Sequence, residues 1–314
     1  MKIAFLEPLG ISGDKLKETI ESIIGTDHEV TYYNDRNEDP AELVKRSKGA
    51  ECVVFSNIKF GKDIIEKLPD LKMICVAFTG VDLVDIEYCK ERGIRVSNCA
   101  GYSTVAVADL VFAFAIDLAR NVIPCDRVIR EGGTKQGLVG FELAGRKMGI
   151  VGAGAIGTRV MEIAKAFDCE VYAYSRTVKD IPGVKFVSFE ELLKTCDIIS
   201  VHVPQTAETK GMFGAKEFAM MKEGALFINL ARGPIVDSEA LANALNAGHL
   251  AGAAVDVYEK EPPIDKDHVL LHAKNLIATP HIAFASQQAF EKRAVIVGNN
   301  LKAYAEGNPI NVIC

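Results

Sequence analysis

Short runs of apolar, often β-branched residues alternate along the chain with stretches in which apolar residues recur at helical spacing. The apolar runs predict buried strands, and the helical period predicts helices such as 14–24. In the first hundred residues, strands are predicted at 2–7, 29–33, 52–56, 73–77 and 95–97. This alternation is typical of parallel βαβ units, so we predict an α/β fold that begins with one doubly wound sheet.

A second alternating series follows a long apolar helix that is predicted at 104–120, with Ser103 available as its N-cap. Pro124 and the glycine pair at Gly132 are expected to interrupt the chain after that helix. Further strands are predicted at 147–151, 170–174, 198–203, 225–229, 253–257 and 276–278. The sequence therefore predicts two doubly wound parallel-sheet domains.

The last helical pattern, at 286–306, has no strand after it. It must pack on elements that are already built, and we expect it to return to the first domain. The first domain would then be discontinuous and comprise 1–99 and 283–314, with the second domain, 100–282, inserted between them.

Composition narrows the class of partner. Acidic residues outnumber basic ones by 42 to 36 and no long Lys/Arg run occurs, so binding to nucleic acid or to an anionic membrane has no support. Asp109 and Asp117 interrupt the longest apolar stretch, and Glu7 precedes any signal-peptide core. The eight cysteines are scattered without a C-x-x-C pair, as in reduced cytosolic proteins. We expect a cytoplasmic protein that binds a small molecule and no metal.

The strand predicted at 147–151 leads directly into a glycine-rich loop and a helix. Gly152, Gly154 and Gly157 allow a tight turn and close approach of a pyrophosphate, while the helix N-terminus offers free N–H groups. Ala155 and Ile156 complete the loop, and another strand follows the helix. This context indicates a dinucleotide site, and the alternative is a purely structural turn.

The end of the next strand distinguishes the two nicotinamide cofactors. An acidic residue there binds a ribose 2′-OH, whereas cations accommodate a 2′-phosphate. The chain has Ser175, Arg176 and Thr177 at this place, with Lys179 close by. NADP(H) is therefore favoured and NAD(H) remains open. The alternative is that Arg176 is a solvated loop residue that stacks on adenine.

Three later segments carry polar residues where strands should end, and they contain Arg232, Glu261 and His281. Carboxyl ends of parallel strands open onto the ligand crevice, so these side chains could bind an anionic substrate and exchange a proton with it. Taken singly, they could also be a surface ion-pair partner, a helix-end charge and a hydrogen-bonded loop histidine. Spacing alone does not show that they converge.

In this order, and behind this glycine loop, the segments resemble the D-isomer-specific 2-hydroxy acid dehydrogenase family. The resemblance covers nearly the whole chain, and its motifs are 152–157, 228–233 with Val236-Asp237, 255–257 leading to Glu261-Pro262, and Thr279-Pro280-His281. It implies a Rossmann cofactor domain inserted into a flavodoxin-like substrate domain, with the active cleft at their junction. It also implies a homodimer, for which the apolar helix at 105–118 is a candidate contact and burial within the monomer is the alternative.

The resemblance implies roles for individual residues. His281 would be the general acid, Glu261 its carboxylate partner and Arg232 the group that grips the 2-oxo acid. A forked guanidinium suits a carboxylate beside an oxo oxygen, and a carboxylate next to the imidazole would orient the ring and favour its protonated form. The implied cofactor-lining positions, some of which could equally have structural roles, are Thr104, His202, Val203, Pro204, Thr209, Leu230, Ala231 and, beside the nicotinamide, Asp256.

The loop at 77–82 resembles the family's segment that presents backbone N–H groups to the substrate carboxylate. Phe78 and Thr79 would line the pocket, and Gly80 would permit close approach of the backbone. The alternative is a plain turn after a buried strand. Ser175 departs from the acidic residue of many NAD-dependent members, and Glu261 argues against formate dehydrogenase, which has Gln there.

These observations favour an NADP(H)-preferring reductase that converts a small 2-oxo acid, such as hydroxypyruvate or glyoxylate, to the D-2-hydroxy acid. One alternative is an NAD-dependent D-lactate or branched D-2-hydroxy acid dehydrogenase. Another, from a different class, is a dinucleotide-sensing corepressor scaffold. The compact acidic chain favours the enzyme.

Overall fold

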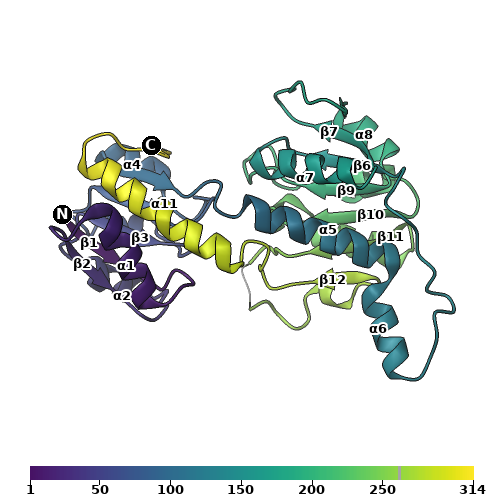
Figure 1. The fold of residues 1–314 in the computed structure, drawn as a ribbon, viewed down its shortest axis with the longest axis horizontal. Coiled ribbons are helices and arrows are strands. Elements are labelled where there is room, and N and C mark those ends of the chain that lie inside the picture. Colours follow the sequence, from purple (N-terminus) through teal and green to yellow (C-terminus); the bar gives the residue numbers. More distant parts are fainter. Residues whose placement is uncertain (261–262) are drawn as a thin grey trace. The chain divides into compact units, whose positions relative to one another are not determined.

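The computed structural model describes residues 1–260 and 263–314, and the chain separates into two compact units. Unit 1 consists of Met1–Ser103 and Ala285–Cys314, and unit 2 of Thr104–Phe284. Each unit is built around one parallel sheet that is flanked by helices (Figure 1). The predicted fold class, two parallel-sheet α/β domains, is confirmed.

Unit 1 contains a five-stranded sheet in the order β2-β1-β3-β4-β5, in which every neighbouring pair is parallel. Strands β3 and β4 are buried at every position, as expected for a sheet with helices on both faces. The elements of unit 1 are β1 (Lys2–Phe5), α1 (Gly13–Ile24), β2 (Glu29–Tyr32), α2 (Pro40–Ser47), β3 (Cys52–Phe55), α3 (Lys62–Ile65), β4 (Met73–Val76), α4 (Ile86–Arg92), β5 (Arg95–Asn98) and α11 (Gln287–Ala305).

The last helix, α11, packs on α1 and β4. Ser286 caps its N-terminus by accepting a hydrogen bond from the amide of Ala289. A Cβ at Gly298 would lie 2.7 Å from Ile23 Cδ1 and 3.2 Å from Ile23 Cβ, so the close approach of α11 to α1 leaves little room for a side chain there. The tail after α11 pairs antiparallel with β5 through Val312. The C-terminal segment is therefore part of unit 1.

Unit 2 contains a seven-stranded parallel sheet in the order β12-β11-β10-β9-β6-β7-β8. One apolar cluster joins α5 and α7 to one face of this sheet, and a second joins α8, α9 and α10 to the other. The elements are α5 (Thr104–Arg120), α6 (Val122–Arg130), β6 (Lys147–Val151), α7 (Ala155–Ala166), β7 (Glu170–Tyr174), β8 (Val184–Phe186), α8 (Phe189–Thr195), β9 (Ile198–Val201), α9 (Ala215–Met220), β10 (Ala225–Asn229), η1 (Gly233–Ile235), α10 (Ser238–Asn246), β11 (Leu250–Val255), η2 (Val269–His272) and β12 (Leu276–Ala278).

Two local expectations for unit 2 are corrected by the structure. Pro124 does not interrupt the chain, because it lies in the first turn of α6, where a backbone N–H has no helical acceptor in any case. The break after α5 occurs instead at Asn121, whose backbone is left-handed. The strand predicted at 198–203 ends at Val201, so His202 already belongs to the loop that follows it.

The apolar helix α5 buries seven side chains, among them Val111 and Phe112, against its own unit. Val105 and Ile116 remain exposed on it. Burial within the chain therefore accounts for most of the apolar surface of this helix. Among the described residues, no helix has the length and apolar character needed to cross a membrane.

Candidate functional site

The glycine loop between β6 and α7 is shaped by close contacts of its own backbone. Gly152 has φ 109°, and a Cβ there would lie 2.7 Å from the His202 carbonyl carbon and oxygen. A Cβ at Gly157 would lie 1.9 Å from the Gly152 carbonyl oxygen. Both positions therefore exclude any side chain, and the loop can only be built with glycine at these two places.

Gly154 differs, because a Cβ there would meet no protein atom within 4 Å. It is the N-cap residue of α7, and no side chain caps this helix. The first N–H groups of α7 and the positive end of its dipole are thus available to an anion that approaches Gly154. These features fit the pyrophosphate of a dinucleotide, as the sequence predicts.

The loop after β7 contains Ser175, Arg176 and Thr177 and lies against the glycine loop. Lys179 Nζ donates to the Ala153 carbonyl oxygen at 2.6 Å, which ties the two loops together. Arg176 lies near enough to Glu208 for its charge to help lower the pKa of that carboxyl, after the larger effect of the Thr206 hydroxyl. Lys179 therefore lies against the glycine loop, and Arg176 lies near the segment that contains Glu208.

The loop after β9 begins with His202, Val203 and Pro204. The His202 amide donates to Val151 O at 2.7 Å, and its Nε2 lies 2.8 Å from Ser200 Oγ. Desolvation lowers the pKa of His202 to about 3, so the imidazole is neutral near pH 7. Thr209 Oγ1 donates to Pro204 O at 2.6 Å, so this predicted cofactor residue also stabilises the loop itself.

The segment that follows β10 holds Leu230, Ala231 and Arg232 in a tight turn. Asn229 forms this turn, since its Oδ1 accepts from the Ala231 amide at 3.0 Å and its Nδ2 donates to Arg232 O at 3.1 Å. A Cβ at Gly233 would lie 1.9 Å from the Tyr258 carbonyl carbon, so the residue after Arg232 packs directly on the chain that follows β11. The backbone on both sides of Arg232 is thus fixed.

The loop that carries His281 is anchored by a buried carboxylate. Asp256 Oδ1 accepts from Thr279 Oγ1 at 2.5 Å and from the Ile282 amide at 2.8 Å, while Oδ2 accepts from the Ala283 amide at 2.7 Å. Burial raises the pKa of Asp256, and these hydrogen bonds and the nearby imidazole oppose that rise. Both oxygens of the residue expected beside the nicotinamide are therefore engaged with the loop around His281.

His281 itself has φ 59°, a left-handed conformation that is uncommon for residues other than glycine. Its ring meets the ring of Phe284 edge-on, with centroids 5.2 Å apart. Strained backbone of this kind persists only where the surroundings over-determine it, and the three hydrogen bonds to Asp256 provide that restraint.

The strand order brings these segments to one edge of the sheet. Strands β10, β11 and β12 are neighbours, and they lead into Arg232, Asp256 and His281 in turn. Tyr258 connects the segments further, because its hydroxyl donates to Thr279 O at 3.2 Å. Glu261, the predicted partner of His281, lies outside the described residues, as does Pro262.

The predicted substrate loop lies in unit 1, immediately after β4. Phe78 is buried and its ring lies 6.0 Å from that of Tyr102, whereas Thr79 is exposed and Gly80 partly so. The Thr79 carbonyl accepts from Asn98 Nδ2 at 2.7 Å. Asn98 was not singled out in the sequence, although its place at the end of β5 is the signal that could have identified it. Thr104 begins α5 and is partly exposed.

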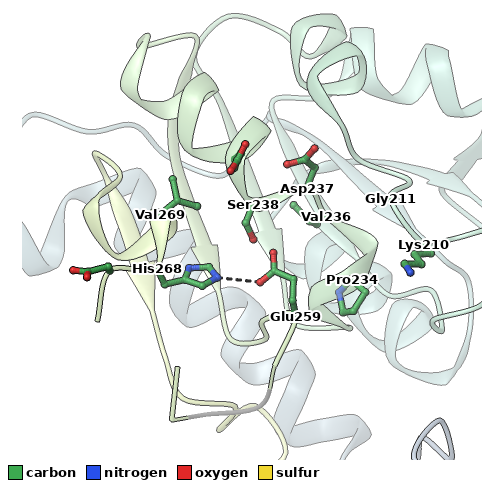
Figure 2. A pocket seen from close by; sticks show the side chains of 11 residues that line it. Lys210, Gly211, Pro234, Val236, Asp237, Ser238, Glu259, His268 and Val269 are labelled. Carbon is green, nitrogen blue, oxygen red and sulfur yellow. Dashed lines mark hydrogen bonds and ion pairs between the residues drawn. The ribbon is translucent and has the colours of Figure 1, made fainter. Parts of the chain in front are cut away.

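A hollow of about 770 Å³ in unit 2 lies between η1, the start of α10 and the segment around His268 (Figure 2). Figure 2 shows Glu259 and His268 facing one another, with His268 Nε2 3.0 Å from Glu259 Oε2. Of the predicted catalytic and cofactor residues that the structure describes, none lines this hollow. Residues 1–260 and 263–314 contain no group of three or more His, Cys, Asp or Glu arranged to hold a metal ion.

Comparison with known proteins identifies the family. Residues 112–283 match the model of the D-isomer specific 2-hydroxyacid dehydrogenase NAD binding domain. The chain is 38% identical over 301 residues to glyoxylate reductase of Thermococcus litoralis, covering 91% of this chain and 90% of that protein. It is 32% identical over 294 residues to hydroxypyruvate reductase of Blautia hydrogenotrophica, covering 90% and 91%.

Among solved structures, an acyclic imino acid reductase in complex with NADPH and D-Arg superposes with a TM-score of 0.90. It is 30% identical in sequence, and the match covers 100% of both chains. The chain therefore belongs to the D-isomer-specific 2-hydroxyacid dehydrogenase family, and it is an oxidoreductase with an NAD(P)-binding domain.

Proposed function

We propose that the protein is an NADP(H)-preferring reductase that converts a small 2-oxo acid, hydroxypyruvate or glyoxylate, to the D-2-hydroxy acid. The observation that carries this proposal is the placement of Arg232, Asp256 and His281 after three neighbouring strands, with the His281 loop fixed by Asp256. Similar proteins named glyoxylate reductase and hydroxypyruvate reductase support the choice of substrate.

In the proposed reaction the cofactor, when bound, supplies a hydride to the oxo carbon. Arg232 grips the substrate carboxylate and oxo oxygen with its planar fork and stabilises the negative charge that develops on that oxygen. His281 donates a proton to the same oxygen, and it accepts the proton in the reverse direction. Glu261 orients the imidazole and favours its protonated form.

The remaining site residues are assigned by the same proposal. Unit 1 is the substrate domain, where the loop of Phe78, Thr79 and Gly80 receives the substrate carboxylate, and unit 2 is the cofactor domain. The residues proposed to line the cofactor are Thr104, Gly152, Gly154, Ala155, Ile156, Gly157, Ser175, Arg176, Thr177, His202, Val203, Pro204, Thr209, Leu230, Ala231 and Asp256.

The proposed function is tested by following nicotinamide absorbance with purified protein. NADPH and NADH are compared in parallel against hydroxypyruvate, glyoxylate, pyruvate, phenylpyruvate and 2-oxoisocaproate. We expect the highest kcat/KM with NADPH and either hydroxypyruvate or glyoxylate. Turnover only with NADH and with pyruvate would instead support a D-lactate dehydrogenase, and turnover only with NADH and the bulky acids a branched-acid dehydrogenase. Tight nucleotide binding without turnover of any 2-oxo acid would contradict the proposal and favour a sensing scaffold.

Replacing Arg176 with alanine is expected to weaken NADPH selectively. A guanidinium makes charge-assisted hydrogen bonds to a 2′-phosphate, so KM for NADPH should rise by about 10-fold or more while KM for NADH changes little. Arg159→Ala is the matched control, because Arg159 is an arginine of the same unit that pairs with Glu162 on the exposed face of α7. An equal rise in KM for NADPH and NADH would show that Arg176 does not bind the 2′-phosphate.

We also propose that the protein acts as a cytoplasmic homodimer. The exposed Val105 and Ile116 on α5 support a contact along this helix. Light scattering coupled to size-exclusion chromatography should give twice the chain mass of 34.0 kDa, and Ile116→Asp should shift the population towards monomer. A mass of one chain at micromolar concentration would contradict this assignment.

A further inference from the structure

Arg293 is a buried cation that the proposed reaction does not use. It lies in α11 and is only 3% exposed. Its Nη2 donates to the Leu9 carbonyl at 2.6 Å, and its Nη1 donates to the Ala77 carbonyl at 3.4 Å. Leu9 follows β1 and Ala77 follows β4, so this guanidinium joins two loops at the carboxyl edge of the unit 1 sheet.

No carboxylate neutralises this charge within the described part of the chain, where Arg293 forms no ion pair and its Nε has no hydrogen-bond acceptor. The buried acid of the same region, Glu7, is paired with Arg36 and accepts from the Ser56 amide and hydroxyl. Among the described residues, Arg293 contacts carbonyl dipoles and the rings of Phe290 and Tyr102, whose centroids lie 4.8 Å and 5.5 Å from the guanidinium carbon, while Glu7 acts on it without forming an ion pair. Burying a charge without a counter-ion raises the free energy of the folded state, so the presence of Arg293 at this position indicates a functional role.

The contact with Ala77 is one of three that hold successive carbonyls of the substrate loop. Ala77 O accepts from Arg293, Phe78 O accepts from the Cys99 amide at 2.9 Å, and Thr79 O accepts from Asn98 Nδ2 at 2.7 Å. In a planar trans peptide the C=O and the following N–H point in opposite directions. Fixing these carbonyls therefore turns the following N–H groups away from the protein.

Two of those N–H groups remain available. Within the described residues, the amides of Thr79 and Gly80 donate to no protein acceptor. Successive N–H groups with free hydrogens form a concave site for an anion, and a buried positive charge behind the loop strengthens the attraction.

We propose that Arg293 is a positioning residue for the substrate carboxylate. It anchors the start of the loop through the Ala77 carbonyl, while the Cys99 amide and Asn98 hold the carbonyls that precede the Thr79 and Gly80 N–H groups, and its buried charge adds positive potential beneath that loop. This inference rests on the proposed function, which places the carboxylate of a 2-oxo acid at the loop.

The test compares wild type with Arg293→Met, which removes the charge at similar length. The inhibitor constant of oxamate, a carboxylate analogue of a 2-oxo acid, should rise by about 10-fold, and KM for the preferred 2-oxo acid should rise in parallel. The kcat at saturation should fall by less than about 3-fold, because Arg293 does not touch the reacting atoms. The cofactor Kd, measured by nicotinamide fluorescence, should not change.

Two further substitutions separate charge from packing. Arg293→Lys keeps the charge and should stay within about 3-fold of wild type, whereas Arg293→Gln keeps a donor without the charge and should resemble the methionine variant. The glutamine variant also provides the test if the melting temperature shows that the methionine variant is unfolded. Folded neutral variants with unchanged oxamate affinity, or a lysine variant as weak as the neutral ones, would overturn the proposal.

Arg46→Met is the matched control, because Arg46 is another buried arginine of unit 1 but pairs with Asp35 and Glu42. It should lower the melting temperature without changing oxamate affinity. If wild type neither reduces a 2-oxo acid nor binds oxamate, the proposed function fails. If wild type does both and the neutral Arg293 variants bind oxamate equally well, only the role of Arg293 fails.

Discussion

Replacing His281 with asparagine is expected to lower kcat for reduction of the preferred 2-oxo acid by about 100- to 10,000-fold, the usual contribution of a general acid. Asparagine cannot act as an acid at neutral pH, so only Arg232 would stabilise the negative charge that develops on the oxo oxygen. Affinity for the nicotinamide cofactor should remain, because the glycine loop of Gly152 and Gly157 is formed independently of this residue. Single-turnover and steady-state absorbance measurements give kcat, and nicotinamide fluorescence gives the cofactor Kd.

Asparagine is the suitable substitution because His281 has φ 59°, and asparagine tolerates the left-handed region better than alanine does. The variant should therefore keep the hydrogen bonds from the loop to Asp256 and the melting temperature of the wild type. His272→Asn is the matched control, since His272 is an exposed histidine of the same unit that bonds to the Lys266 carbonyl. Turnover that survives in the His281 variant would remove this residue from the acid role.

The parts of the fold that could be predicted are those with strong local signals. The glycine loop lies between a strand and a helix as expected, because Gly152 and Gly157 are required by backbone contacts that any βαβ turn of this kind makes. Strand β8 (Val184–Phe186) was missed. It is a three-residue edge strand with partly exposed positions, so neither its length nor its hydrophobicity distinguishes it from a loop.

The site was less predictable where it depends on contacts between distant residues. Arg293 stands in an amphipathic helix, where an arginine is expected on the solvent side, yet it is buried and bonds to a carbonyl 284 residues away. The carboxylate of Asp256 could be placed at a strand end from the sequence, but its three hydrogen bonds to the His281 loop join residues 23 to 27 positions apart. No periodicity in one segment carries information of this kind.

Replacing Arg232 with lysine is expected to raise KM for the 2-oxo acid and lower kcat together, with a fall in kcat/KM of about 100-fold or more. Lysine keeps the positive charge but has no planar fork, so it cannot hold the carboxylate and the oxo oxygen at once. The turn should persist in the variant, because Asn229 and the approach of Gly233 to Tyr258 hold it in addition to the hydrogen bond that Arg232 Nη1 donates to the Ala231 carbonyl at 2.8 Å.

A rise in KM together with a fall in kcat distinguishes a clamp from two simpler roles of Arg232. If Arg232 only attracted the carboxylate, and did so equally in the ground state and the transition state, its replacement would raise KM and leave kcat unchanged. If it contacted only the transition state, its replacement would lower kcat and leave KM unchanged. Arg159→Lys, on the exposed face of α7, controls for a general effect of arginine replacement and should show wild-type kinetics. If Arg232→Lys also shows wild-type kinetics, a point charge suffices there, and substrate orientation must come from the Phe78–Gly80 loop.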